Sequence, residues 1–118
     1  MSDQHQLGRD GEEAAANYLI SKGFRIEVRN WRKGKDEIDL VARKEDLIVF
    51  AEVKTRSGTV NDLSEIIGRQ KEKSLIRSAN EYVQDLAEDL DCRIDLLIVQ
   101  KNKGSFSVIH YEDAIQQE

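Results

Sequence analysis

An acid and a base lie two residues apart in the segment VFAEVKTR, at Glu52 and Lys54. The segment begins as an apolar strand, and side chains alternate between the two faces of a strand. Glu52 and Lys54 therefore point to the same face as Ile48 and Phe50. A carboxylate and an ammonium group on an apolar face can bind an ion or move a proton, so this pair is the first candidate for chemistry.

A second carboxylate, that of Asp39, is expected directly opposite Glu52. This follows if residues 45–46 form a two-residue hairpin loop, so that Lys44 pairs with Leu47. Directly opposed residues share a face, with Cβ atoms roughly 5 Å apart. Two ionised carboxylates at that distance repel by about 3 kcal/mol at an effective dielectric near 20. That is a large part of the ~5–15 kcal/mol that stabilises a small domain.

Three arrangements would offset this repulsion between Asp39 and Glu52. The two carboxyl groups can share a proton, Lys54 can partly neutralise them, or a divalent cation can bind between them. Hard oxygen ligands on adjacent strands suit Mg²⁺ or Mn²⁺. A plainer explanation is a surface ion-pair patch, either Glu52 with Lys54 or Asp39 with Arg43. The residues alone leave these explanations open.

A third carboxylate can come from the first expected helix. Glu12 is three and seven residues before Ala15 and Leu19, so it lies on the apolar stripe of that helix. Glu13, on the neighbouring face, is the competing candidate. Either residue can instead be a first-turn acid that the helix dipole favours.

The elements that position these residues alternate between helical and strand patterns. Apolar periodicity predicts helices over residues 8–22 and 62–90, and strands over residues 24–31, 37–43, 47–54, 92–100 and 106–111. Asp62 and Glu65 form a capping-box pattern, and Gly68 can interrupt the second helix. The order αβββαββ predicts an α/β or α+β fold with one mixed sheet, in which the strand after the long helix runs parallel to a central strand.

Length and composition predict one domain over residues 1–118, with a lean core and flexible ends of about six and about three residues. No apolar run approaches the ~20 residues that cross a membrane. The polar N-terminus has no secretory signal, and the one cysteine, Cys92, excludes an internal disulfide. Together these features favour a cytoplasmic setting and no membrane partner. We expect Cys92 to be a core thiol.

Basic residues gather at residues 25–35 and 69–77, although the net charge of the chain is −5. Such zones favour weak, salt-sensitive binding to nucleic-acid phosphates, but they are also ordinary for solvated surface. The acidic net charge favours a partner protein that supplies the basic surface. The candidate nucleic-acid contacts are Arg29, Arg32, Lys33, Arg56, Lys71 and Lys73.

Five short motifs follow one another along nearly the whole chain: Gly11-Glu12, Gly23-Phe24, Arg29-Asn30-Trp31-Arg32, Glu37-Ile38-Asp39-Leu40 and Phe50-Ala51-Glu52-Val53-Lys54-Thr55-Arg56. In this order they resemble the YraN-type family, an uncharacterised family of the PD-(D/E)XK nuclease superfamily that is similar to archaeal Holliday junction resolvases. The resemblance implies a restriction-endonuclease-like fold. The residue before Asp39 is Ile38 and not the proline of the superfamily's name, which removes no carboxylate.

The resemblance also implies a role for each candidate residue. Asp39 and Glu52 would hold Mg²⁺ or Mn²⁺ together with the backbone carbonyl of Val53, and Glu12 would reach the ion through water or hold a second ion. Lys54 would orient or deprotonate the attacking water, or neutralise the charge of the transition state. The implied activity is metal-dependent endonucleolytic hydrolysis of phosphodiester bonds in DNA, including branched or repair intermediates.

Several alternatives stay open. The chain can be a non-catalytic nucleic-acid- or protein-binding module on a nuclease-like fold, or a small metal-binding structural domain. Lys71 would point at the scissile strand or extend along the helix edge, Trp31 would stack on a base or anchor the core, and Asp95 would pair with Arg93. His110 has no assigned role. The sequence does not choose DNA over RNA, junction over duplex or flap, or monomer over homodimer.

Overall fold

The computed structural model describes residues 3–57 and 67–116, and its elements follow the predicted order αβββαββ. They are α1 (Asp3–Ser21), β1 (Arg25–Lys33), β2 (Asp36–Lys44), β3 (Leu47–Ser57), α2 (Arg69–Leu86), β4 (Asp91–Asn102) and β5 (Ser105–Tyr111). The strands form a five-stranded sheet in the order β1-β2-β3-β4-β5. The restriction-endonuclease-like arrangement, a mixed sheet flanked by helices, is therefore confirmed.

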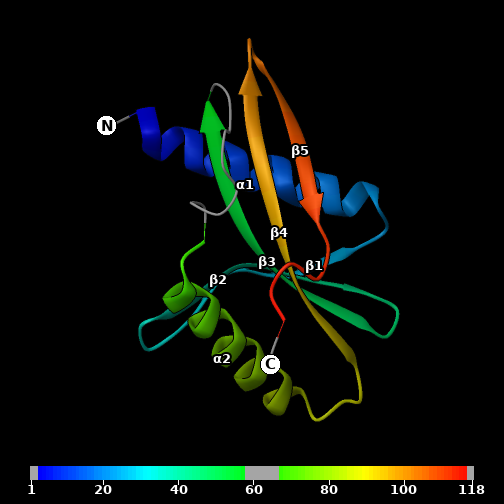
Figure 1. Cartoon of the computed structure of the whole chain (residues 1–118). Coiled ribbons are helices and arrows are strands. Elements are labelled where there is room, and N and C mark those ends of the chain that lie inside the picture. The colour runs from blue at the N-terminus through cyan, green and yellow to red at the C-terminus, as the bar shows by residue number, and fades with distance from the viewer. Residues whose placement is uncertain (1–2, 58–66, 117–118) are drawn as a thin grey trace.

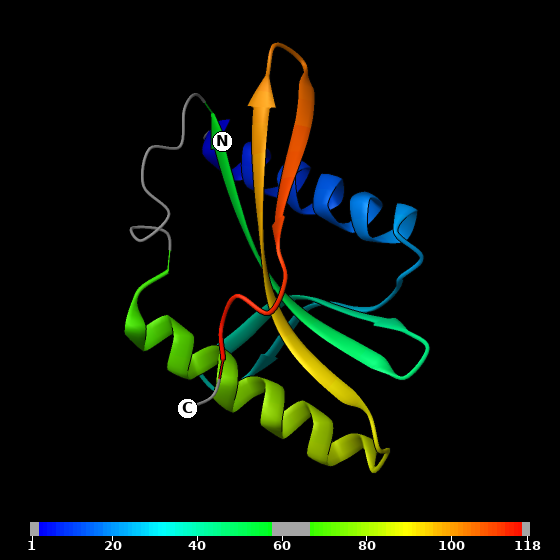
Figure 2. The ribbon, with the colours of Figure 1, turned by 45° about the vertical axis from the view of Figure 1, so that its right-hand side comes forward.

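The sheet is mixed because one connection is a crossover. β1 pairs with β2, β2 with β3, and β4 with β5 in antiparallel fashion, whereas β4 runs parallel to β3. The chain reaches β4 through α2, which supplies the long connection that a parallel pair requires. α1 crosses one face of the sheet and α2 lies against the other (Figures 1 and 2). The predicted parallel pairing of the strand after the long helix is confirmed.

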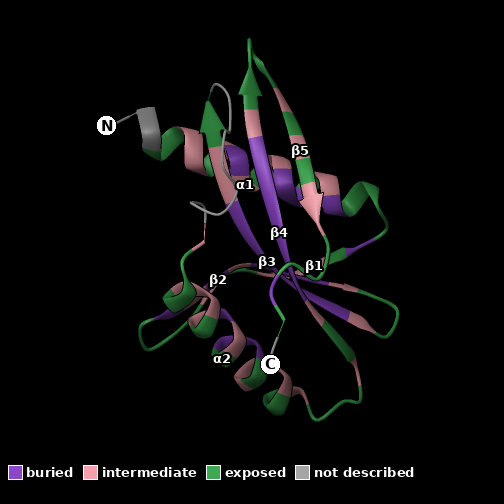
Figure 3. Ribbon diagram, viewed as in Figure 1, coloured by how far each residue is buried: buried purple, intermediate pink, exposed green. Residues whose placement is uncertain are grey.

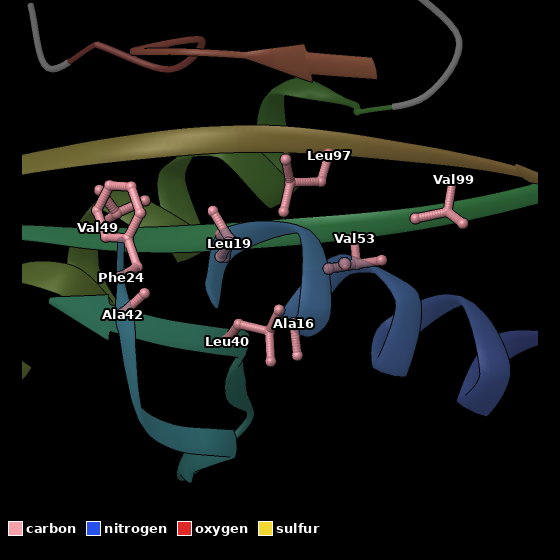
Figure 4. Close-up of a cluster of buried hydrophobic side chains, with 11 residues drawn as sticks. Ala16, Leu19, Phe24, Leu40, Ala42, Val49, Val53, Leu97 and Val99 are labelled. Atoms are coloured by element: carbon pink, nitrogen blue, oxygen red, sulfur yellow. The ribbon is translucent and has the colours of Figure 1, made fainter. Parts of the chain in front are cut away.

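Two apolar clusters fill the space on the two faces of the sheet. The cluster under α1 contains Leu19, Phe24 and Val49 (Figure 4). The cluster under α2 contains Phe50 and Leu75. β3 and the middle of β4 contribute to both clusters, and they form the most continuous buried segments of the sheet (Figure 3). The predicted alternation along β3 is therefore real, and its two faces pack against different helices.

Trp31 belongs to the edge of the α2 cluster. It is partly buried, and its ring meets that of Tyr82 edge to face, with 5.7 Å between ring centroids. This packing favours the interpretation of Trp31 as a core anchor over that of a base-stacking residue.

The ends of the helices differ from the predictions. α1 begins at Asp3, well before the predicted residue 8, and α2 begins after an N-cap at Gly68 and ends at Leu86. Gly68 is therefore the N-cap of α2, and the part of the predicted helix before residue 67 lies outside the described residues. Ala87 follows with a left-handed φ of 54°, a conformation that commonly ends helices. The capping-box pattern at residues 62–65 lies outside the described residues.

The prediction of Cys92 as a core thiol is wrong. Cys92 is exposed, since it lies at the start of β4, before the buried part of the strand. Burial in β4 starts at Ile94. Neither described helix is long and apolar enough to cross a membrane.

Candidate acidic site between β2 and β3

The hairpin register that was predicted from the sequence is confirmed. β2 and β3 pair from Lys44 with Leu47 to Leu40 with Ala51, with residues 45–46 as the two-residue connection. At Leu40 this ladder ends, although β2 continues alongside β1 as far as Asp36. β3 continues alongside β4 as far as Ser57. The two strands therefore separate at the position where Asp39 and Glu52 would have been the next pair.

The alternation of side chains between the two faces of the sheet is also broken at Asp39 in β2. Ile38 packs in the α2 cluster and Leu40 in the α1 cluster, whereas strict alternation would place both on one face. On β1, the residue that passes Asp39 is Asn30, which has a left-handed φ of 53° that asparagine tolerates better than most residues. The irregularity turns the Asp39 side chain toward β3.

The Asp39 carboxylate takes the place of the missing strand partner of β3. Its Oδ2 accepts a hydrogen bond of 2.8 Å from the backbone N–H of Val53. The N–H and C=O of one strand residue point to the same edge, so the Val53 carbonyl faces the same opening. The Asp39 carboxylate and the Val53 carbonyl therefore lie at the same edge of β3.

Glu52 is almost fully buried, with a relative exposure of 2%. It lies on the α2 face of β3, and its Oε2 is 3.7 Å from Nζ of Lys54 and 3.5 Å from Nζ of Lys71. Lys71 extends from the first turn of α2 toward the acidic pair. The interpretation of Lys71 as a residue directed into the site is favoured over that of a side chain extended along the helix edge.

The environment raises the pKa of Glu52 to about 8. Burial is the largest cause, followed by a hydrogen bond to Asp39 and the charge of Asp39, while Lys71 and Lys54 act in the opposite direction. The lysine effects are smaller because both N–O distances exceed the ~2.7–2.9 Å of a close charge-assisted hydrogen bond. The raised pKa favours a proton shared between Glu52 and Asp39, and the two lysines lie close enough to offset part of the remaining negative charge.

Glu12, and not Glu13, is the helix carboxylate that approaches this pair. Burial raises the pKa of Glu12, and the charges of Asp39 and Glu37 raise it further. Glu13 is exposed and accepts a hydrogen bond of 2.6 Å from Arg29. Because α1 begins at Asp3, Glu12 lies in the middle of the helix, and the first-turn explanation for it is wrong.

Gly11 allows α1 to lie directly on β3 beside this site. A Cβ atom at Gly11 would be 1.9 Å from Oγ1 of Thr55, much closer than any real contact. A glycine inside a helix costs roughly 0.5–1 kcal/mol relative to alanine, so its position here needs a reason. The close approach of α1 to the end of β3 supplies that reason, and it carries Glu12 to the opening.

These residues line one cavity of about 790 Å³, bounded by the first half of α1, the end of β3 and the start of α2. The predicted site residues that line it are Glu12, Asp39, Glu52, Val53, Lys54, Arg56 and Lys71. Arg9 lines it too and was missed by sequence reasoning. The available signal was its spacing, three residues before Glu12 on the same helix.

The other predicted nucleic-acid contacts lie outside this cavity. Arg29 borders a small adjoining pocket and pairs with Glu13. Arg32 is 3.6 Å from Glu37, and Lys33 is 3.7 Å from Glu81. Lys73 lines a separate cavity along α2. The first basic zone is thus largely neutralised by neighbouring acids.

The oxygen donors at this edge meet part of what a metal ion needs. Within residues 3–57 and 67–116, no three His, Cys, Asp or Glu side chains gather closely enough to hold one. Asp39, Glu52 and the Val53 carbonyl are nevertheless hard oxygen donors of the kind that Mg²⁺ and Mn²⁺ prefer. An ion beside them would need water for its remaining ligands, and Glu12 lines the same cavity.

A second buried polar group lies on β4, apart from the cavity. Asp95 is fully buried and binds Arg93 through two hydrogen bonds of 2.9 Å, which confirms the pairing expected from the sequence. Its Oδ2 is also 2.6 Å from Nε2 of His110, whose other ring nitrogen is 3.1 Å from the Tyr18 hydroxyl. Sequence reasoning missed this network because it depends on how β5 and α1 pack around β4.

The candidate site is thus a buried pair of carboxyl groups, flanked by lysines, at the point where two strands of a mixed sheet separate. Residues 11–99 match the model of the uncharacterised protein family UPF0102. A UPF0102 protein of Bacteroides thetaiotaomicron is 39% identical over 115 residues, covering 97% of this chain and 95% of its own. One of Prosthecochloris aestuarii is 41% identical over 123 residues, covering 97% and 96%. The chain belongs to the UPF0102 family.

One solved structure is also similar, "The structure of Pyrococcus Furiosus SfsA in complex with Ca2+". The alignment covers 93% of this chain at 18% identity, with a TM-score of 0.45. The chain spans 64% of the length of that protein.

Proposed function

We propose that this UPF0102 chain is a cytoplasmic endonuclease that hydrolyses phosphodiester bonds in DNA with Mg²⁺ or Mn²⁺. The observation that carries the proposal is the placement of the buried Glu52 beside Asp39, with Lys54 and Lys71 within 4 Å of Glu52. Two carboxyl groups that need a proton in order to lie together form a site in which a divalent cation can replace that proton. The two neighbouring lysines then remain available for an anionic substrate.

The proposed division of roles follows from the positions of the side chains. Asp39, Glu52 and the Val53 carbonyl would hold the ion, which would neutralise phosphate oxygens and acidify a water molecule. Asp39 is already oriented by the Val53 N–H, and Glu52 by its burial. A site fixed in this way need not reorganise when charge develops.

Lys54 and Lys71 would act on the phosphate. Each ammonium group is within 4 Å of Glu52 Oε2, at 3.7 and 3.5 Å, and both side chains are only partly exposed. Once an ion neutralises Glu52, the lysines can turn to the non-bridging oxygens of a phosphodiester. Lys54, on the same strand as Glu52, would also orient the attacking water, or deprotonate it after losing its own proton.

Glu12, Arg9 and Arg56 would complete the walls of the cavity. Glu12 would position a water molecule from the side of α1, and the two arginines would contact flanking phosphates. The cavity of about 790 Å³ is large enough for more than the reacting group alone.

A second candidate function is a binding module without catalysis. It is favoured by the net charge of −5 and by the ion pairs that neutralise Arg29, Arg32 and Lys33. Such a module would bind nucleic acid or a protein partner through the same fold. In such a module, Asp39 and Glu52 would only stabilise the fold.

The proposal is tested by thermal unfolding and by cleavage in the same buffers. Mn²⁺ should raise the Tm of the wild type by mass action, and more strongly above the pKa of Glu52, about 8, than well below it. Glu52→Gln should lose both this shift and the cleavage of labelled junction, flap and duplex DNA. Glu13→Gln is the matched control, because it changes a neighbouring exposed acid.

Equal Mn²⁺ shifts in wild type and Glu52→Gln would show that the ion binds elsewhere. A wild type that binds Mn²⁺ at Glu52 and cuts none of these DNA substrates would favour the binding module.

A further inference from the structure

The cavity has a neighbour that the proposed function does not use, the hairpin formed by β4 and β5. Ser57 lines the cavity and pairs with Lys101 on β4. Adjacent strands lie about 4.8 Å apart, so the base of this hairpin adjoins the cavity wall. The turn between β4 and β5 projects past the end of β3 in both views (Figures 1 and 2).

The tip of the hairpin is a tight and defined turn. Asn102 pairs with Ser105, and the two residues between them, Lys103 and Gly104, have φ values of 44° and 86°. Two central residues with positive φ are the mark of a type I′ turn, whose twist matches that of the strands. At ~3.3 Å per residue the tip lies roughly 7–10 Å beyond the level of Ser57.

The paired part of the hairpin, residues 96–111, contains two lysines and no acid. The chain contains 23 acidic residues, yet none occurs between Asp95 and Glu112, a stretch that includes Lys101 and Lys103. Both lysines are exposed, and in the part of the chain that the structure describes neither forms an ion pair. They differ in this respect from the neutralised first basic zone.

The adjoining end of β3 also contains basic residues and no acidic residue. Val53 to Ser57 contains Lys54 and Arg56 and no acid. Lys101, which pairs with Ser57, follows the α1 face of the sheet, whereas Lys54 and Arg56 share the α2 face with Phe50. The basic residues of β3 and of the hairpin therefore flank the same end of the sheet from its two faces. In a chain with a net charge of −5, Lys101 and Lys103 attract a polyanion because no acid among the described residues is paired with them.

We infer that the β4–β5 hairpin is a second binding surface for the nucleic-acid backbone, which holds the strand beyond the cavity through Lys101 and Lys103. The inference rests on the proposed function for its choice of polyanion. The surface recognises phosphates without reading bases, because lysine contacts a phosphate as a point charge.

The test is fluorescence anisotropy without divalent ions, on a labelled DNA duplex and on one of its strands alone. The variant Lys101→Gln with Lys103→Asn should bind roughly tenfold more weakly at low salt, and the slope of log affinity against log salt should fall by about 2, one unit per lost phosphate contact. Lys35→Gln is the control, since Lys35 is an exposed lysine in the β1–β2 turn. It should stay within about twofold of wild type.

The turn substitution separates lost binding from lost folding. Asparagine adopts a left-handed conformation more readily than lysine and is preferred in type I′ turns, so Lys103→Asn should keep or raise the Tm. A weaker affinity in a variant that is at least as stable supports the inference.

Other outcomes overturn it. Unchanged affinity in the double variant, or an equal loss in Lys35→Gln, removes the hairpin from the interface. Loss of binding to labelled oligo-glutamate with unchanged DNA binding would mark it as a surface for acidic peptides. If the wild type binds DNA through the hairpin but never cleaves it in Mn²⁺, the proposed endonuclease activity is wrong and the binding surface stands. If the wild type cleaves DNA and the double variant binds and cleaves it equally well, the binding surface is wrong and the activity stands.

Discussion

The backbone N–H of Val53 donates a hydrogen bond of 2.8 Å to the side chain of Asp39. This bond closes the edge of β3 where β2 has left it, so one carboxylate performs the task that a strand partner performs elsewhere. The same bond fixes Asp39 beside Glu52, and the raised pKa of Glu52 follows from that placement together with its burial. Asp39 therefore contributes both to the structure of this edge and to the electrostatics of Glu52.

Two substitutions of Asp39 should separate these two roles. Asp39→Asn keeps an oxygen that can accept from the Val53 N–H but removes the charge, so the pKa of Glu52 should fall below about 8 and stay above 4.5 because Glu52 remains buried. Asp39→Ala should cost about 1–3 kcal/mol more than Asp39→Asn in the free energy of unfolding, since it leaves a buried donor unpaired. Carboxyl NMR titration and urea unfolding measure the two effects. Equal stability of the two variants would contradict the structural role.

The stability of the metal-free protein should depend on pH through Glu52. Its pKa is about 8 in the folded state against 4.5 for an unperturbed glutamate, so the folded state binds this proton more tightly than the unfolded state. The stabilisation is fully present below pH 4.5 and is lost as pH rises through about 8. Urea unfolding should show a fall of roughly 2–5 kcal/mol over this window in wild type, at ~1.4 kcal/mol per pKa unit. In Glu52→Gln this part of the pH dependence should be absent, and parallel curves for the two proteins would count against it.

Lys54 should matter for turnover more than for binding. Its ammonium group lacks a lone pair and cannot ligate an ion, so its contribution belongs to the transition state. Lys54→Ala should keep Mn²⁺ and DNA affinities close to those of wild type and lose roughly 10²–10⁴ in single-turnover cleavage rate. Lys44→Ala changes a lysine at the far end of β2 and serves as the control. Equal cleavage rates for wild type and Lys54→Ala would reduce Lys54 to an ion-pair partner.

Two glycines of α1 should respond in opposite ways to alanine. Gly8 has no atom within 4 Å of a Cβ atom placed there, so Gly8→Ala should stabilise the protein by up to ~1 kcal/mol through helix propensity. Gly11→Ala would collide with Thr55 and should destabilise it by about 1–3 kcal/mol. Adding Thr55→Gly should recover part of that loss, because it removes all three contacting atoms. Similar unfolding curves for the two single variants would show that α1 shifts freely over β3.

Much of the β2–β3 hairpin was predictable because its register depends on local information. A two-residue connection and a clear apolar pattern are enough to pair Lys44 with Leu47, and the proximity of Asp39 to Glu52 follows from that pairing. The change of facing at Asp39 was not predictable in this way. It involves Asn30 on another strand, and nothing in the alternation of β2 indicates it.

The other differences also have nonlocal causes. Cys92 precedes the buried part of β4, which begins at Ile94. The apolar run in the sequence does not show where that burial begins. The partner of His110 is Asp95 on the neighbouring strand, in a pairing set by the β4–β5 turn. The start of α1 at Asp3 lies in a polar segment whose periodicity is weak.

β3 has two unlike edges over the residues that matter most. On the side of β4 its ladder is continuous from Leu47 to Ser57, whereas on the side of β2 it ends at Ala51. Glu52, Val53 and Lys54 are therefore held in register by β4, while on the side of β2 no strand pairs with them and the Asp39 side chain accepts from the Val53 N–H. A substrate that approaches from the side of β2 leaves the pairing of β3 with β4 intact. The acidic pair can therefore be reached while the strand that carries it stays rigid.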